Sequence, residues 1–181
     1  RVTGLSTGAI AKHSAVKLTS EVIVLSIVSE QQDFISKLLN GGTEPETWDE
    51  LSAIGAVYWC ENQDRLRAII ERFWAKEYKE FKDPWRILFW VILLGKPKVL
   101  SGLFKLQPDS HKFVNFFMED FTTPAAQTKA VNNAFALRAK KRFLDSAAFF
   151  ILARKFREAM EILLSQVQSL QLMILVFRFF E

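Results

Sequence analysis

The feature that most constrains this fold is the punctuation of its apolar segments. From Pro45 onward, each stretch of apolar residues with helical periodicity follows a capping residue or a proline, and several end at a glycine. The signals are Thr47 with Glu50, Asn62, Asp83-Pro84, Pro97 and Thr123-Pro124. One helix, for example, is expected to start at Thr47 and to continue through Ile54 to Tyr58. The pattern therefore predicts a succession of short helices.

The last helices follow one another closely. They are expected at 141–153, 155–166 and 169–181. Because their first residues are about 13–15 positions apart, the turns between them are very short, and neighbouring helices must be antiparallel. Small residues such as Ala134 and Ala147 allow close approach of these helices. The predicted fold class is all-α, an α-solenoid-like stack of antiparallel helix hairpins. Because no strict sequence repeat is visible, an irregular helical bundle is the alternative.

The N-terminal part is less regular. Residues 1–45 are expected to be a lead-in with a helix near 29–39, because Ser29 and Gln32 resemble a capping box. Just before it, residues 21–28 contain a run of β-branched residues that favours a strand. Residues 46–181 form the expected helical scaffold segment, and the apolar stretch that runs to Phe180 predicts that this segment is truncated at its C-terminus.

Composition excludes several classes of protein. Half of the residues are hydrophobic and 17 are Phe, which indicates a folded chain and not a disordered one. The longest apolar run, Ile87–Leu94, has eight residues, whereas a membrane-spanning helix needs roughly 20. The single cysteine, Cys60, cannot form an internal disulfide, which agrees with a reducing, cytoplasmic location.

Charge is distributed unevenly along the chain. The net charge is +4, made up of −3 over residues 1–50 and +7 over residues 51–181. The densest basic cluster consists of Arg138, Lys140, Lys141 and Arg142, followed about one hairpin later by Arg154, Lys155 and Arg157. These residues are a candidate basic edge that binds an acidic partner surface. The alternative is that they interact only with the negative ends of helix dipoles.

Residues suited to catalysis or metal binding are sparse. Neither His13 nor His111 has a Cys, Asp or His near it at metal-ligand spacing, and the apolar neighbours of Cys60 indicate a packed thiol. The glycines form no phosphate-binding pattern. The Phe residues have the spacing of core residues, which argues against binding of nucleic acid. The sequence therefore predicts a protein-binding segment without catalytic residues, cofactor or metal. A helical domain that accompanies a catalytic domain outside this sequence is an alternative.

Several separated blocks carry a family resemblance. The blocks are Asp83-Pro84 with 88–93, 96–104, 129–137, 140–143 with 146–153, Glu158-Ala159, and 170–181. In this order they resemble the large subunit of the RAVE complex and its animal relatives, the DmX-like or rabconnectin proteins, over roughly residues 54–181. Two turns depart from the family pattern, because Ala139 stands where relatives tend to have a glycine, and Arg154-Lys155 stands where a small residue is usual. Tight left-handed turns are therefore less expected there.

The resemblance implies a function in assembly of the vacuolar-type proton pump, the V-ATPase. Members of this family promote reassociation of the pump's peripheral and membrane sectors, and the matching region is a helical segment that follows N-terminal β-propellers. The implied partners are peripheral-sector subunits and other RAVE subunits, in a hetero-oligomeric assembly. The implied location is the cytoplasmic side of acidic endomembranes, with indirect membrane association. No site residue is carried over from the family. A helical solenoid of a vesicle coat or tethering complex is the alternative.

Overall fold

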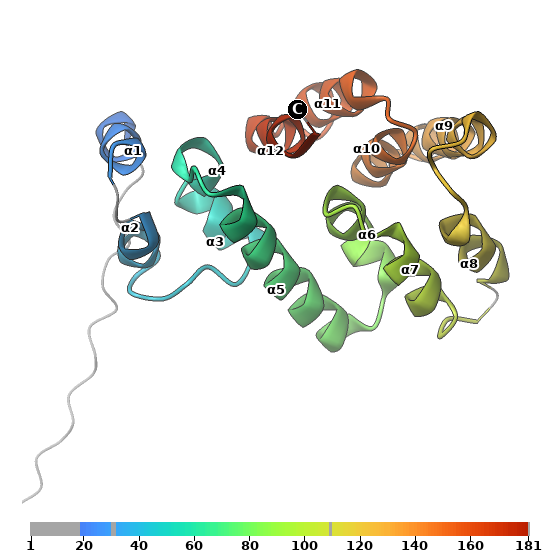
Figure 1. The fold of residues 1–181 in the computed structure, drawn as a ribbon, viewed down its shortest axis with the longest axis horizontal. Coiled ribbons are helices and arrows are strands. Elements are labelled where there is room, and N and C mark those ends of the chain that lie inside the picture. Colours follow the sequence, from blue (N-terminus) through green and yellow to red (C-terminus); the bar gives the residue numbers. More distant parts are fainter. Residues whose placement is uncertain (1–18, 30–31, 109, 181) are drawn as a thin grey trace, which may run out of the picture.

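The structure is a computed structural model that describes residues 19–29, 32–108 and 110–180. In these ranges the regular elements are helices, and no strand is present. The helices are α1 (Ser20–Ile27), α2 (Gln32–Leu39), α3 (Trp48–Ala53), α4 (Ala56–Trp59), α5 (Gln63–Phe81), α6 (Pro84–Leu93), α7 (Pro97–Phe104), α8 (His111–Met118), α9 (Pro124–Ala139), α10 (Phe143–Leu152), α11 (Phe156–Ser165) and α12 (Leu170–Phe180) (Figure 1). The predicted all-α class is confirmed.

Capping residues start these helices where the sequence predicts. The Thr47 hydroxyl and the Asn62 side-chain oxygen each accept a hydrogen bond from the backbone N–H three residues later, at 3.2 and 3.0 Å. Thr123 caps α9 in the same way, whereas the Asp83 carboxylate caps α6 by accepting from the backbone N–H two residues later, at 3.0 Å. A proline occupies the first helical position after each of them. Local sequence therefore explains where these helices begin.

The helix predicted to run from Thr47 to Tyr58 is in fact two helices. Helix α3 ends at Ala53, and α4 begins after Gly55, which has a left-handed φ of +61°. Glycine adopts this conformation without the strain that a Cβ would cause, so it permits the break. The indole N–H of Trp59 donates to the Ile54 carbonyl at 2.9 Å, which satisfies an acceptor at the end of the first helix.

The helices stack in two rows. In Figure 1, α5 to α8 follow one another along one row and α9 to α12 along the other. Consecutive helices pack within each row, and α6 of the first row packs against α10 of the second. Helix α12 returns to α4, where the Arg178 guanidinium donates to the carbonyls of Val57, at 2.7 Å, and Cys60. Contacts between α12 and α4 therefore join parts of the predicted stack of antiparallel hairpins that lie far apart in the sequence.

Helix α6 lies at the centre of the core. Every residue from Ile87 to Leu93 is buried, because α5, α7 and α10 surround the helix. At the α9–α10 contact, Ala134 and Ala147 are fully buried, and the Ser146 hydroxyl donates to the Ala134 carbonyl at 2.8 Å. Such a hydrogen bond between helices requires close backbone approach, which the small side chains permit.

The N-terminal helices are less deeply packed. The run of β-branched residues that favours a strand lies in α1, and α2 lies within the range where a helix is expected near 29–39. The rest of the expected lead-in, residues 1–18, lies outside the described residues.

Among the helices that the structure describes, none is both long and apolar enough to span a membrane.

Candidate protein-binding surfaces

The residues of the candidate basic edge lie in two separate turns. Arg138, Lys140, Lys141 and Arg142 lie at the turn from α9 to α10, and Arg154, Lys155 and Arg157 at the turn from α10 to α11. Helix α10 has ten residues. At a rise of about 1.5 Å per residue, the two turns are roughly 15 Å apart, at opposite ends of the helix. The structure brings the basic residues together within each turn but does not join the two turns into one cluster.

Arg142 differs from the other residues of the basic edge. It is half-buried, its Nε donates to the Asp145 carboxylate at 2.6 Å, and its guanidinium lies 4.2 Å from the centroid of a Trp85 ring. Burial raises the pKa of Asp145, and the positive charge of Arg142 opposes this rise. The other basic-edge residues are exposed, and none forms an ion pair within the described ranges. Their binding to a partner stays a prediction.

Both basic turns contain a residue in the left-handed conformation, although the departures from the family pattern make such turns less expected. Lys141 has a φ of +59° and Arg154 a φ of +56°. The following residue, Arg142 or Lys155, donates its backbone N–H to the carbonyl five residues back, at 3.0 and 2.9 Å. This Schellman pattern satisfies carbonyls at the helix end, and a positive side chain there also lies near the negative end of the dipole.

A groove of about 550 Å³ borders the second basic turn. Its apolar lining includes Ile151 and Phe156, and the basic residues Lys98 and Arg154 also line it. Asp120 also lines the groove, and the pKa of its carboxyl is lowered mainly by hydrogen bonds from Thr122, with a smaller effect of the two cations. Because these cations face a carboxylate of the same chain, the groove shows no clear preference for a charged partner.

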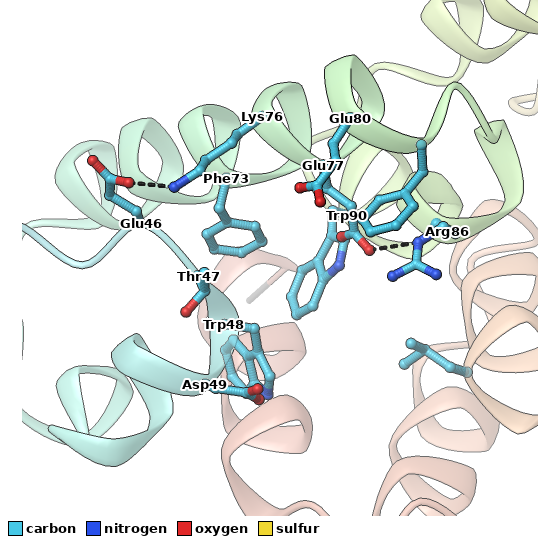
Figure 2. Close-up of a pocket in the computed structure, with 12 residues that line it drawn as sticks. Glu46, Thr47, Trp48, Asp49, Phe73, Lys76, Glu77, Glu80, Arg86 and Trp90 are labelled. Carbon is cyan, nitrogen blue, oxygen red and sulfur yellow. Dashed lines mark hydrogen bonds and ion pairs between the residues drawn. The ribbon is translucent and has the colours of Figure 1, made fainter.

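A second cleft, which the sequence analysis did not predict, lies where α3, α5 and α6 meet (Figure 2). Its volume is about 420 Å³. The floor consists of the aromatic residues Trp48, Phe73 and Trp90. Charged side chains stand around this floor, namely Glu46, Asp49, Lys76, Glu77, Glu80 and Arg86. We refer to these nine residues as the aromatic cleft.

The floor of the aromatic cleft is held by ring contacts. The rings of Trp48 and Trp90 have centroids 5.1 Å apart, and Phe73 meets Trp90 edge to face at 4.9 Å. Phe73 and Trp90 are buried, whereas Trp48 is half-buried. Among the three rings of the floor, Trp48 therefore offers the most accessible surface, and the other two rings support it.

Two ion pairs use the cations of the aromatic cleft. Lys76 donates to the Glu46 carboxylate, so this contact raises the pKa of Lys76 and lowers the pKa of Glu46. Arg86 donates to Glu77 at 2.9 Å and also lies over the Phe81 ring, 3.9 Å from its centroid. Asp49 and Glu80 form no ion pair with any residue that the structure describes. The cleft therefore has an excess of negative charge.

A weak signal for this cleft is present in the sequence. Glu77 and Glu80 are three residues apart on α5, and the apolar face of the same helix includes Phe73. That spacing places both carboxylates on neighbouring positions of one helix. The identity of the elements opposite them, α3 and α6, could not be read from the pattern.

Of the remaining candidates for chemistry, Cys60 is buried in the core, His111 is exposed, and His13 lies outside the described residues. Burial raises the pKa of the Cys60 thiol, which keeps it protonated and poorly nucleophilic at neutral pH. In the part of the chain that the structure describes, no three His, Cys, Asp or Glu side chains are grouped so as to hold a metal ion. The surfaces above are suited to noncovalent binding.

Comparison with known proteins gives consistent matches. The family model described as RAVE protein 1 C terminal matches residues 5–181. DmX-like protein 1 of Mus musculus is 33% identical over 151 residues, which cover 83% of this chain and 5% of the relative. Regulator of V-ATPase in vacuolar membrane protein 1 of Saccharomyces cerevisiae is 32% identical over 141 residues, covering 75% of this chain and 10% of the relative. The chain thus spans a small part of the length of these relatives.

Proposed function

We propose, from the premise that this chain belongs to the RAVE protein 1 C-terminal family, that it is a scaffold segment of a V-ATPase assembly factor. In this proposal the segment has no catalytic function and binds protein partners while the peripheral and membrane sectors of the pump reassemble. The partners would be peripheral-sector subunits and other RAVE subunits. The segment would act in the cytoplasm, peripherally associated with acidic endomembranes.

The observation that carries this proposal is the family match over nearly the whole chain, together with the names of the yeast relatives. Two of them, from Saccharomyces cerevisiae and Schizosaccharomyces pombe, are named as regulators of V-ATPase in the vacuolar membrane. Those names describe a regulator and not an enzyme.

The packing of the helices supports a scaffold function. Helix α12 contacts helices that lie far from it in the sequence: Gln171 donates to the Ser52 carbonyl of α3 at 2.9 Å, and Arg67 of α5 lies over the Phe179 ring at 4.2 Å. A stack joined by such contacts between distant helices holds its surfaces at fixed separations. Partners bound to such a body meet at a raised effective concentration, which favours assembly without covalent chemistry.

Affinity purification of the full-length parent protein from cell extract tests the proposal, with this segment as a parallel bait and mass spectrometry of the copurified proteins. We expect peripheral-sector subunits of the pump on the full-length bait. Their retention on the segment would locate a contact within these helices. In parallel, the ratio of peripheral to membrane sectors on isolated acidic organelles should fall when the segment is deleted from the parent.

The alternative of a coat or tethering solenoid predicts a different set of proteins. Coat or adaptor proteins on the full-length bait, with no pump subunits and with an unchanged sector ratio after deletion, would refute the assembly function. A deletion that lowers the abundance of the parent protein is controlled by comparing cells with matched amounts of the two proteins.

A further inference from the structure

We propose that the aromatic cleft is a docking site for a basic segment of a partner protein, which inserts one Arg or Lys side chain over Trp48 and between the unpaired carboxylates. This inference goes beyond the proposed function, because it concerns the chemistry of one partner and not the complex to which that partner belongs.

The charge of the cleft favours a cation. Its rim has four carboxylates and two cations, a local balance of −2 in a chain whose net charge is +4. Both cations already have a carboxylate partner, and Asp49 and Glu80 form no ion pair among the described residues, although the charge of Glu80 also acts on Lys76. Asp49 and Glu80 can therefore attract a positive group from outside. An anionic segment would be repelled, and an apolar segment would desolvate these carboxylates without compensation.

The aromatic floor favours a cation as well. The face of an indole ring attracts cations, and Trp48 is the accessible ring of the floor. Arg86, on the wall of the same cleft, already combines a carboxylate, Glu77, with the face of an aromatic ring, Phe81. A partner's cation over Trp48 and near Asp49 would find the same two kinds of contact.

The shape of the cleft suits an extended side chain. A volume of about 420 Å³ holds a long side chain together with part of its backbone. The lining comes from the loop before α3 and from α3, α5, α6 and α10, so the site is preformed by packed helices. We expect Arg to bind better than Lys, because a planar guanidinium can stack on an indole and still donate to a carboxylate.

A titration with small probes tests the chemistry directly. N-acetyl-arginine methylamide and its citrulline analogue, which has nearly the same shape but no charge, are added to the isotope-labelled chain while NMR records the indole N–H signals. The signals are assigned with Trp48→Phe and Trp90→Phe variants. The arginine probe should shift the Trp48 signal in a saturable way and leave that of the buried Trp59 unchanged. The citrulline probe should bind about ten-fold more weakly.

Charge variants supply the matched control. Asp49→Asn with Glu80→Gln should abolish the preference for arginine over citrulline, whereas Glu161→Gln, at an exposed position on α11, should leave it unchanged. Thermal unfolding of each variant verifies that it is folded. Equal binding of the two probes, no saturable shift of Trp48, or an effect of Glu161→Gln equal to that of the cleft variant would overturn the proposal.

Photo-crosslinking in the full-length parent extends the test to the natural partner. A benzoylphenylalanine placed at position 48 should crosslink to a segment with an Arg or Lys within a few residues, and one at the exposed position 177 on α12 serves as the control site. Crosslinks from position 48 to acidic or uncharged segments would contradict the inference, as would their absence when position 177 crosslinks normally.

Discussion

Helices α6, α9 and α10 end in the same left-handed turn, although only α6 has a glycine there. The residues are Gly95, Lys141 and Arg154, with φ of +71°, +59° and +56°. In each case the next residue's N–H bonds to the carbonyl five positions back. We predict that at all three positions the protein is more stable with glycine than with alanine, whereas inside a helix alanine is the more stabilising residue.

The magnitude follows from two opposing terms. A Cβ in the left-handed region costs roughly 1–2 kcal/mol, and the greater freedom of glycine in the unfolded chain offsets about 0.4–1 kcal/mol of this. A Cβ at Gly95 would meet no atom within 4 Å, so the cost there is conformational and not steric. Arg154→Gly should therefore have a free energy of unfolding about 1 kcal/mol above that of Arg154→Ala. Comparison with alanine cancels the loss of the arginine charge.

Urea unfolding followed by circular dichroism measures these differences. A difference of 1 kcal/mol corresponds to about 2–4 °C in Tm for a chain of this size. The control position is Asn133, exposed within α9, where alanine should exceed glycine by about 0.5–1 kcal/mol. If alanine is at least as stabilising as glycine at positions 141 and 154, the turns are not left-handed and the reasoning fails.

Three further predictions concern the core and the titrating groups. Phe149→Ala should lower the free energy of unfolding, measured by urea titration, by about 3–5 kcal/mol, because the Phe149 ring is buried. The ring also stacks on Phe116, with ring centroids 5.3 Å apart. A loss of less than about 1 kcal/mol would refute this packing. Iodoacetamide should modify Cys60 at least about ten-fold more slowly in the folded than in the urea-unfolded chain, since burial raises its pKa, and equal rates would show an accessible thiol. Burial also raises the pKa of the Asp145 carboxyl, so the folded state binds a proton at this carboxyl more tightly than the unfolded state does. The protonated carboxyl therefore contributes to stability at low pH. This contribution is lost as the pH rises through the pKa of Asp145 in the folded state. The stability of Asp145→Asn relative to the parent should therefore increase as the pH rises above the ordinary pKa of an aspartate, about 4, and a decrease would show that the ion pair with Arg142 dominates.

Helix starts were the most predictable part of this fold. Thr47, Asn62, Asp83 and Thr123 all cap helices as expected, because a cap depends on residues only two or three positions away. The break at Gly55 was missed, because the residues on both sides continue a helical apolar pattern and the pattern does not report φ.

The candidate binding surfaces were less predictable. The basic residues could be identified by their density in sequence, but the length of α10 separates them into two turns. The aromatic cleft was not identified, because its residues come from α3, α5 and α6, and each helix contributes only a few ordinary-looking side chains.

The sequence by itself determined the all-α class, the order and starts of most helices, and membership of a family. These properties rest on local interactions, namely caps, prolines and 3.6-residue periodicity, which neighbouring residues establish. Only the tertiary structure decided that α6 packs against α10, that α12 returns to α4, and that Trp48 meets Trp90. These contacts join residues far apart in the chain, and they depend on how many side chains pack together at once.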